Sequence, residues 1–189
     1  MREKISQIGE IREVVYDKDH IQLLNELRNQ AIDILRRLQS YELNGFVHGS
    51  IARGDVHKSS DIDIVILDNY SLHLVINAVE VLGGYSHASI VMATPIHTPK
   101  IYFYLDPLER KVISAPLGKL STVELEFYRF GGILDLRGLL NNERVAGVDK
   151  RLMLIQPTPW GHIERSVIGH EAEVAKILNI SIETVLDRV

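Results

Sequence analysis

The chain has 189 residues, of which 46% are hydrophobic and 24% charged, and its formal net charge is −4 with a pI of about 6.1. This composition is ordinary for a soluble globular protein with one good core, or a core plus a small appendage. The absence of cysteine excludes disulfides and thiolate metal sites, and the acidic balance provides no global field that attracts nucleic acid. No apolar run approaches the length of a membrane span and no signal-peptide pattern opens the chain, so we expect a cytoplasmic protein.

Two helices are predicted at the start of the chain. Within residues 1–16, apolar residues recur at every third position and favour a short helix: Ile5, Ile8, Ile11 and Val14. Residues 17–19 then supply N-cap candidates for a long helix that runs to about Tyr41. Most of its charged residues, including Arg28, lie outside a single apolar stripe that we expect to pack on a sheet: Leu24, Leu27, Ala31, Ile34 and Leu38.

The central segment, residues 45–68, begins with a strand end and a tight turn. Phe46 and Val47 read as the end of a short buried strand, the Gly49-Ser50 turn follows, and residues 51–53 begin a brief helix. Such a turn leaves backbone N–H groups unpaired and directed outward. It therefore favours the binding of a phosphate group.

The same segment continues into a β-branched strand, Asp61 to Leu67. Because side chains alternate along a strand, Asp61 and Asp63 share one face and the three isoleucines of this strand share the other. Two carboxylates about 7 Å apart at Cα can share metal ions. A solvated strand start explains either aspartate alone, but it does not explain the turn, the arginine and both aspartates together.

The following residues predict the rest of a small α+β core. Ser71 caps a helix over residues 72–82, and a buried-looking strand lies at 89–93. Residues 100–105 and 111–115 form a hairpin. We therefore predict a small mixed β-sheet with helices packed on one face, within a core domain of residues 1–116 that includes the N-terminal helix.

Residues 117–189 are predicted to form a mainly helical C-terminal extension. Ser121 and Glu124 have capping-box spacing at the start of a helix that Gly131-Gly132 ends. A strand at 151–155 precedes a rigid surface turn at 157–161.

The extension ends in a pattern similar to a helix-turn-helix at residues 171–189. Ala175 and Leu178 would face the core, Ser181 would cap the second helix, and Val185 would pack back. The second helix carries little positive charge, so sequence-specific DNA binding is disfavoured. A helical pair that packs on the core or mediates homo-oligomer formation is the preferred interpretation.

The motifs in the central segment carry a family resemblance. The motif Gly49-Ser50-x-Ala52-Arg53-Gly54 is followed by Asp61-x-Asp63, with ten residues between Ser50 and Asp61. This pattern resembles the signature of the DNA polymerase β-type nucleotidyltransferase superfamily. It is most similar to the small minimal nucleotidyltransferases of prokaryotes. The motif spans roughly a tenth of the chain, and several residues must coincide to produce it.

The resemblance implies a reaction and a set of site residues. Gly49 and Ser50 would hold the triphosphate of an NTP, expected to be ATP, and Asp61 and Asp63 would ligate Mg²⁺ or Mn²⁺. The enzyme would move a nucleoside monophosphate to an acceptor and release pyrophosphate. Two cations are candidate phosphate ligands, Arg53 and Lys58. For Arg53, a structural ion pair with Asp55 or Asp61 is an equally good interpretation.

The third carboxylate of the family pattern has no clear counterpart. We expect its strand to be 90–93 or 100–105, and neither holds an internal acid. Asp106 has the right parity for a metal ligand, although a turn role beside Pro107 is the simpler interpretation. The metal site is therefore predicted to be weak.

A second hypothesis is a nucleotide-binding regulatory or antitoxin-like module with little transfer activity. The acceptor is left open: RNA, protein or a small molecule all fit this core.

Overall fold

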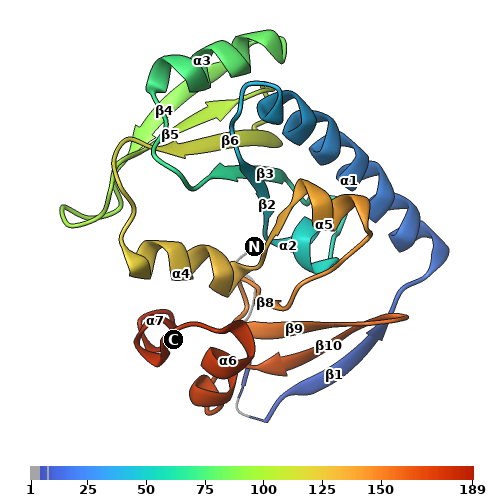
Figure 1. Ribbon diagram of the computed structural model, residues 1–189. Coiled ribbons are helices and arrows are strands. Elements are labelled where there is room, and N and C mark those ends of the chain that lie inside the picture. Colours follow the sequence, from blue (N-terminus) through green and yellow to red (C-terminus); the bar gives the residue numbers. More distant parts are fainter. Residues whose placement is uncertain (1–4, 8) are drawn as a thin grey trace.

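The computed structural model describes residues 5–7 and 9–189, which form two β-sheets with helices around them (Figure 1). The strands are β1 (Ile11–Val15), β2 (Gly45–His48), β3 (Ile62–Ile66), β4 (His87–Val91), β5 (Lys100–Tyr104), β6 (Lys111–Pro116), β7 (Ile133–Asp135), β8 (Gly147–Val148), β9 (Met153–Thr158) and β10 (Gly161–Ser166). The helices are α1 (Lys18–Gln39), α2 (Ser50–Arg53), α3 (Leu72–Val81), α4 (Thr122–Gly131), α5 (Leu136–Leu140), α6 (Glu171–Leu178) and α7 (Ile182–Leu186).

The main sheet is mixed and has six strands in the order β4-β5-β6-β3-β2-β7. Only β3 and β6 pair in parallel; the other neighbours are antiparallel. Helices α1 and α3 cover one face and enclose the largest apolar core, while α4 packs on the opposite face through Tyr128 and Val65 (Figure 1). The predicted α+β class with a mixed sheet is therefore confirmed.

Helix α1 follows its sequence prediction, with one exception. The Asp17 side chain accepts a hydrogen bond from the His20 N–H and caps the helix, and the predicted stripe packs into the core. Arg28, however, is buried rather than on the outer face. Its guanidinium donates to the carbonyl oxygens of Ile51 and Ala52, so this charged side chain helps to hold α2.

The prediction of a helix within residues 1–16 is wrong for the described part of this range, because residues 11–15 form strand β1. This strand pairs with β10 in an antiparallel four-stranded sheet of order β1-β10-β9-β8, so a distant partner determines its conformation. Ile8, part of the predicted apolar spacing, lies outside the described residues. Strand β10 was not predicted, and β9 covers the expected strand at 151–155 with a shift toward the C-terminus.

Three further local predictions can be compared with the structure. The hairpin of β5 and β6 is confirmed, as is the capping box of α4 between Ser121 and Glu124. Strand β4 exists, but it is an exposed edge strand rather than a buried one, and Ile90 keeps 64% of its surface accessible.

The C-terminal helical pair packs on the rest of the chain as the sequence indicated. Ala175, Leu178 and Val185 are buried in a cluster with Phe130 of α4 and residues of the second sheet. The Ser181 hydroxyl caps α7 and, with that of Thr184, donates a hydrogen bond to Glu126 of α4. This face of the pair is therefore used for packing.

The segment after residue 116 contributes to both sheets. Strand β7 completes the main sheet beside β2, while β8, β9 and β10 build the second sheet. The division at residue 116 therefore stays a proposal, and one strand of the main sheet comes from beyond it. Among the described residues, no helix combines the length and hydrophobicity that crossing a membrane requires.

Candidate functional site

The Gly49-Ser50 turn lies where β2 ends and α2 begins. Gly49 has φ 78° and ψ −139°, a backbone conformation that residues with a Cβ rarely adopt. Its N–H donates to the Gly132 carbonyl oxygen at 2.9 Å, which ties the turn to the end of α4. No heavy atom lies within 4 Å of the position that a Cβ would take, so the space beside the turn is open.

The two aspartates lie where the alternation predicts. Asp61 immediately precedes β3 and Asp63 is its second residue, and both are exposed. The isoleucines between and after them are buried against α1 and α3. Asp63 is directly opposite His48 in the antiparallel pair of β2 and β3, so the acids lie beside the Gly49-Ser50 turn.

The electrostatics of the pair favour a bound cation. Although Asp63 keeps exposed surface, partial desolvation of its carboxyl by nearby protein atoms raises its pKa. The Asp61 charge raises this pKa further, and Lys150 partly offsets both effects. A cation between the carboxylates would relieve this like-charge repulsion. Lys150 precedes β9 and is exposed; its place beside the acids depends on the fold and carried no signal in the sequence.

His48 contributes a neutral ring to this region. Burial, Arg53 and Lys100 lower the pKa of His48 to about 4, so its imidazole is uncharged at neutral pH. Its Nε2 is buried without a hydrogen-bond partner among the described residues. A Cβ on Gly131 would lie 2.3 Å from this nitrogen, which explains a glycine within the last turn of α4.

The two predicted phosphate-binding cations have different surroundings. Arg53 is buried: its guanidinium forms a two-bond ion pair with Asp55 and donates to the carbonyl oxygens of Gly131 and Val148. These contacts match the structural alternative considered for Arg53. Lys58 is exposed, and its carbonyl oxygen accepts a hydrogen bond from the Arg110 guanidinium. The Arg110 guanidinium therefore lies against the Lys58 backbone, near the start of β3.

Asp106 is not placed to bind a metal with the acid pair. Its carboxylate accepts hydrogen bonds from the backbone N–H groups of Leu108, Arg110 and Lys111, and it closes the turn between β5 and β6. The neighbours of β3 are β2 and β6, and neither is one of the two strands expected. The residues of β6 opposite Asp63 and Val65 are Val112 and Ser114, so this strand also lacks an acid.

A divalent cation fits the two aspartates but finds few other protein ligands. Within the part of the chain that the structure describes, no group of three acidic or histidine side chains is arranged to hold a metal ion. Oxygen ligands suit Mg²⁺, which commonly binds through one or two carboxylates together with substrate phosphates. The two aspartates therefore offer a cation only part of its ligands, and the others would have to come from water or a bound ligand.

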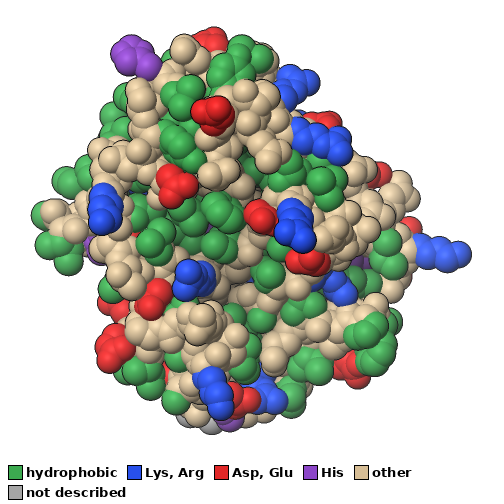
Figure 2. Space-filling model, viewed as in Figure 1, with side chains coloured by type: hydrophobic (Ala, Val, Ile, Leu, Met, Phe, Trp, Pro, Cys, Tyr) green, Lys and Arg blue, Asp and Glu red, His purple; other side chains and the backbone are tan. Residues whose placement is uncertain are grey.

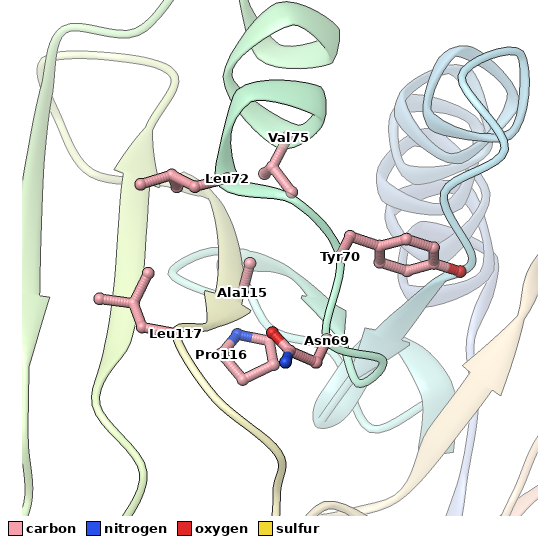
Figure 3. A pocket seen from close by; sticks show the side chains of 7 residues that line it. All are labelled: Asn69, Tyr70, Leu72, Val75, Ala115, Pro116 and Leu117. Carbon is pink, nitrogen blue, oxygen red and sulfur yellow. The ribbon is translucent and has the colours of Figure 1, made fainter.

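A separate pocket of about 230 Å³ lies at the other end of β3 and β6 (Figure 3). Its lining is largely apolar and consists of Asn69, Tyr70, Leu72, Val75, Ala115, Pro116 and Leu117. The acids lie at the start of β3 and this pocket beyond its end, so the two are distinct. On the face drawn in Figure 2, basic and acidic side chains are interspersed, in line with the net charge of −4.

Comparison with known proteins assigns the central segment. Residues 28–80 match the family described as nucleotidyltransferase domain, and this range includes the turn and both aspartates. The resemblance predicted from the sequence is thereby confirmed. No curated protein matches the chain.

Solved structures with a similar arrangement are distant. The GLD-2/RNP-8 complex matches with 16% identity and a TM-score of 0.34, over 61% of this chain and 46% of that chain. The non-canonical poly(A) polymerase complex GLD-2–GLD-3 matches with 16% identity and a TM-score of 0.35, over 61% and 39%. The polymerase core of TRAMP, an RNA surveillance complex, matches with 14% identity and a TM-score of 0.35, over 61% and 37%. The chain thus spans less than half the length of each.

Proposed function

We propose that this chain, whose residues 28–80 match the nucleotidyltransferase domain family, moves a nucleoside monophosphate from an NTP to an acceptor hydroxyl. The observation that carries the proposal is the position of the exposed acid pair directly beside the open Gly49-Ser50 turn. Carboxylates next to a phosphate-binding turn are the arrangement that phosphoryl transfer requires, because this chemistry depends on positioning and on neutralising charge.

The residues would divide the work as follows. The Gly49 N–H is bonded to Gly132, so the backbone N–H groups that follow it at the start of α2, together with the Ser50 hydroxyl, would hold the triphosphate. Lys58 and Lys150 would offset its charge. Asp61 and Asp63 would hold Mg²⁺ or Mn²⁺, which when bound neutralises phosphate oxygens and lowers the pKa of the attacking hydroxyl. Arg53 would act by holding α2, through its bonds to Asp55 and to the end of α4.

The reaction forms one bond and breaks one. The acceptor oxygen bonds to the α-phosphorus, the bond from this phosphorus to the bridging oxygen breaks, and pyrophosphate leaves with that oxygen. The proton of the acceptor hydroxyl passes to solvent. We propose ATP as the donor.

A labelling experiment tests the proposal. The protein is incubated with NTPs labelled at the α-phosphate, Mg²⁺ or Mn²⁺, and pooled cell RNA and protein; we expect label in an acceptor and release of pyrophosphate. Asp63→Asn should lower the transfer rate about a hundredfold or more, because charge stabilisation at the reacting phosphate is lost. Asp68→Asn, an exposed aspartate beyond the other end of β3, is the matched control. Transfer by Asp63→Asn at the wild-type rate would refute the metal role.

A nucleotide-binding module with little transfer is the alternative, and the composition of β6 favours it. Val112 is opposite Asp63, at the position on β6 where a third carboxylate could assist. Both functions require NTP binding, which calorimetry measures directly. NTP binding without pyrophosphate release, across the pool of acceptors, would support the module over the enzyme.

A further inference from the structure

The strand order places two different surfaces on either side of the acid pair. One row of residues on the same sheet face, running from β2 to β4, is His48, Asp63, Val112, Tyr104 and His87. The Gly49-Ser50 turn adjoins the β2 end of this row. Strands β6, β5 and β4 extend from the acids in the opposite direction.

Tyr104 forms a wall on that opposite side. Its ring stacks on the His87 ring with centroids 4.4 Å apart and planes at 13°, and the His87 Nε2 lies 3.2 Å from a carboxylate oxygen of Glu109. Because His87 covers one face of the tyrosine ring, the other face is turned toward β6. The hydroxyl also accepts a hydrogen bond from Ser89 at 3.5 Å.

The side chain between Tyr104 and Asp63, across the sheet, is short. Val112 of β6 separates them, and two strand spacings amount to about 9.6 Å. A nucleic-acid base that stacks on the tyrosine ring takes up less than half of this distance between the β5 and β3 backbones. Val112, Tyr104 and Tyr102 are each only partly buried, so this part of the sheet face is accessible.

The geometry of phosphoryl transfer determines which ligand this surface meets. The attacking and leaving oxygens lie roughly in line at the reacting phosphorus. If the turn holds the departing pyrophosphate on the β2 side, the acceptor must approach from the β6 side. Positive charge is available there, because Arg110 directly precedes β6 and its guanidinium donates to the Lys58 carbonyl oxygen near the start of β3.

We propose that the surface formed by Tyr104 and Val112 binds the terminal base of a single-stranded nucleic acid, whose 3′ hydroxyl is the acceptor of the transfer. This inference rests on the proposed function and names its acceptor class. The base stacks on the free face of Tyr104 above Val112, which places the attached sugar beside Asp63. Stacking of this kind is tolerant of sequence, and Arg110 and Lys58 complement the phosphates of the strand.

The test measures binding separately from transfer. A fluorescent single-stranded oligoadenylate RNA is titrated with the protein in the absence of NTP and metal. We expect Tyr104→Ala to weaken binding about tenfold or more and Tyr104→Phe to stay within about twofold of wild type, because phenylalanine keeps the ring. Val112→Phe should also weaken binding by filling the slot. Val81→Phe on the exposed side of α3 is its matched control.

Labelling of the same RNA by the same variants separates the inference from the proposed function. Transfer to RNA that falls in parallel with binding supports both. Efficient transfer to RNA by Tyr104→Ala and Val112→Phe, or label found only on protein or a small molecule, overturns the inference and leaves the proposed function standing. RNA binding that depends on Tyr104 without any transfer supports the surface and refutes the enzyme.

Discussion

The two flanks of the acid pair are built in opposite ways. On the β2 side, the short helix α2 is held by two buried arginines, Arg28 and Arg53, and the turn before it is bonded to the end of α4. On the β5 side, the rings of Tyr104 and His87 are accessible and rest on one another with few hydrogen bonds. The difference indicates that the turn is held in one conformation, which suits the proposed binding of the same phosphate group in every cycle. The β5 side instead presents accessible aromatic rings to a ligand.

Removal of Arg53 should break the rigid flank most severely. Arg53→Met leaves Asp55 and the Gly131 carbonyl oxygen without their partner, and loss of one member of a buried ion pair costs about 3–5 kcal/mol. Urea denaturation should therefore show a large fall in the free energy of unfolding. Arg37→Met, an exposed arginine near the end of α1, should change it by no more than about 0.5 kcal/mol. A loss below about 1 kcal/mol for Arg53→Met would contradict the anchoring role.

Acid should weaken the second sheet through Glu164. Burial alone would raise the pKa of this carboxyl, but hydrogen bonds from His162 and Arg151 lower it to about 2. A lowered pKa means that the carboxylate stabilises the fold above the unfolded value of 4.5, and that about 3 kcal/mol is lost as the pH falls from there through 2. Glu164→Gln should flatten this part of the stability profile, whereas exposed Glu173→Gln should not. An unchanged profile in Glu164→Gln would refute the assignment.

The conformation of Gly49 gives a test that separates strain from ligand contact. Gly49→Val should lower NTP affinity about tenfold, because a branched side chain fills the open space where phosphate is proposed to bind. Both Gly49→Val and the control Gly83→Val should cost about 1–3 kcal/mol of stability, since each glycine has positive φ and open surroundings. Equal NTP affinity of the two variants in calorimetry would count against phosphate binding at the turn.

Asp106 should give the smallest effect on transfer. Asp106→Asn keeps one carbonyl oxygen for the turn, so we expect transfer within about twofold of wild type and a stability loss of about 1 kcal/mol. Thermal unfolding and the labelling assay measure the two quantities. A fall in transfer as large as that of Asp63→Asn would indicate that Asp106 is a metal ligand. It would also mean that the β5–β6 turn rearranges to bring Asp106 to the acid pair.

The features that could be predicted from the sequence depend on interactions between residues close together in the chain. The Asp17 cap, the apolar stripe of α1 and the capping box of α4 act over a few residues, and their helices are found where expected. The alternation of Asp61 and Asp63 with buried isoleucines likewise depends only on strand geometry.

The remaining features depend on distant contacts. Strand β10 buries His162, Glu164 and Ser166, a polar face that reads as solvent-exposed until its partners are known. The parallel pairing of β6 with β3 determines which residues flank the acids, and no local pattern predicts it. The sequence of α1 predicts Arg28 outside the apolar stripe, because it gives no sign of the acceptors, the carbonyl oxygens of Ile51 and Ala52 in α2.

The pairing of β1 with β10 has a consequence for synthesis. Ile11 is matched with Arg165, so about 150 residues must be translated before β1 meets its partner. At roughly 5–20 residues per second, the ribosome needs roughly 8–30 s to supply them. During that interval β1, with Ile11 and Val15 exposed even in the finished fold, has its backbone groups unpaired and can attract other nascent chains. The four-stranded sheet therefore cannot be completed until β10 has been translated.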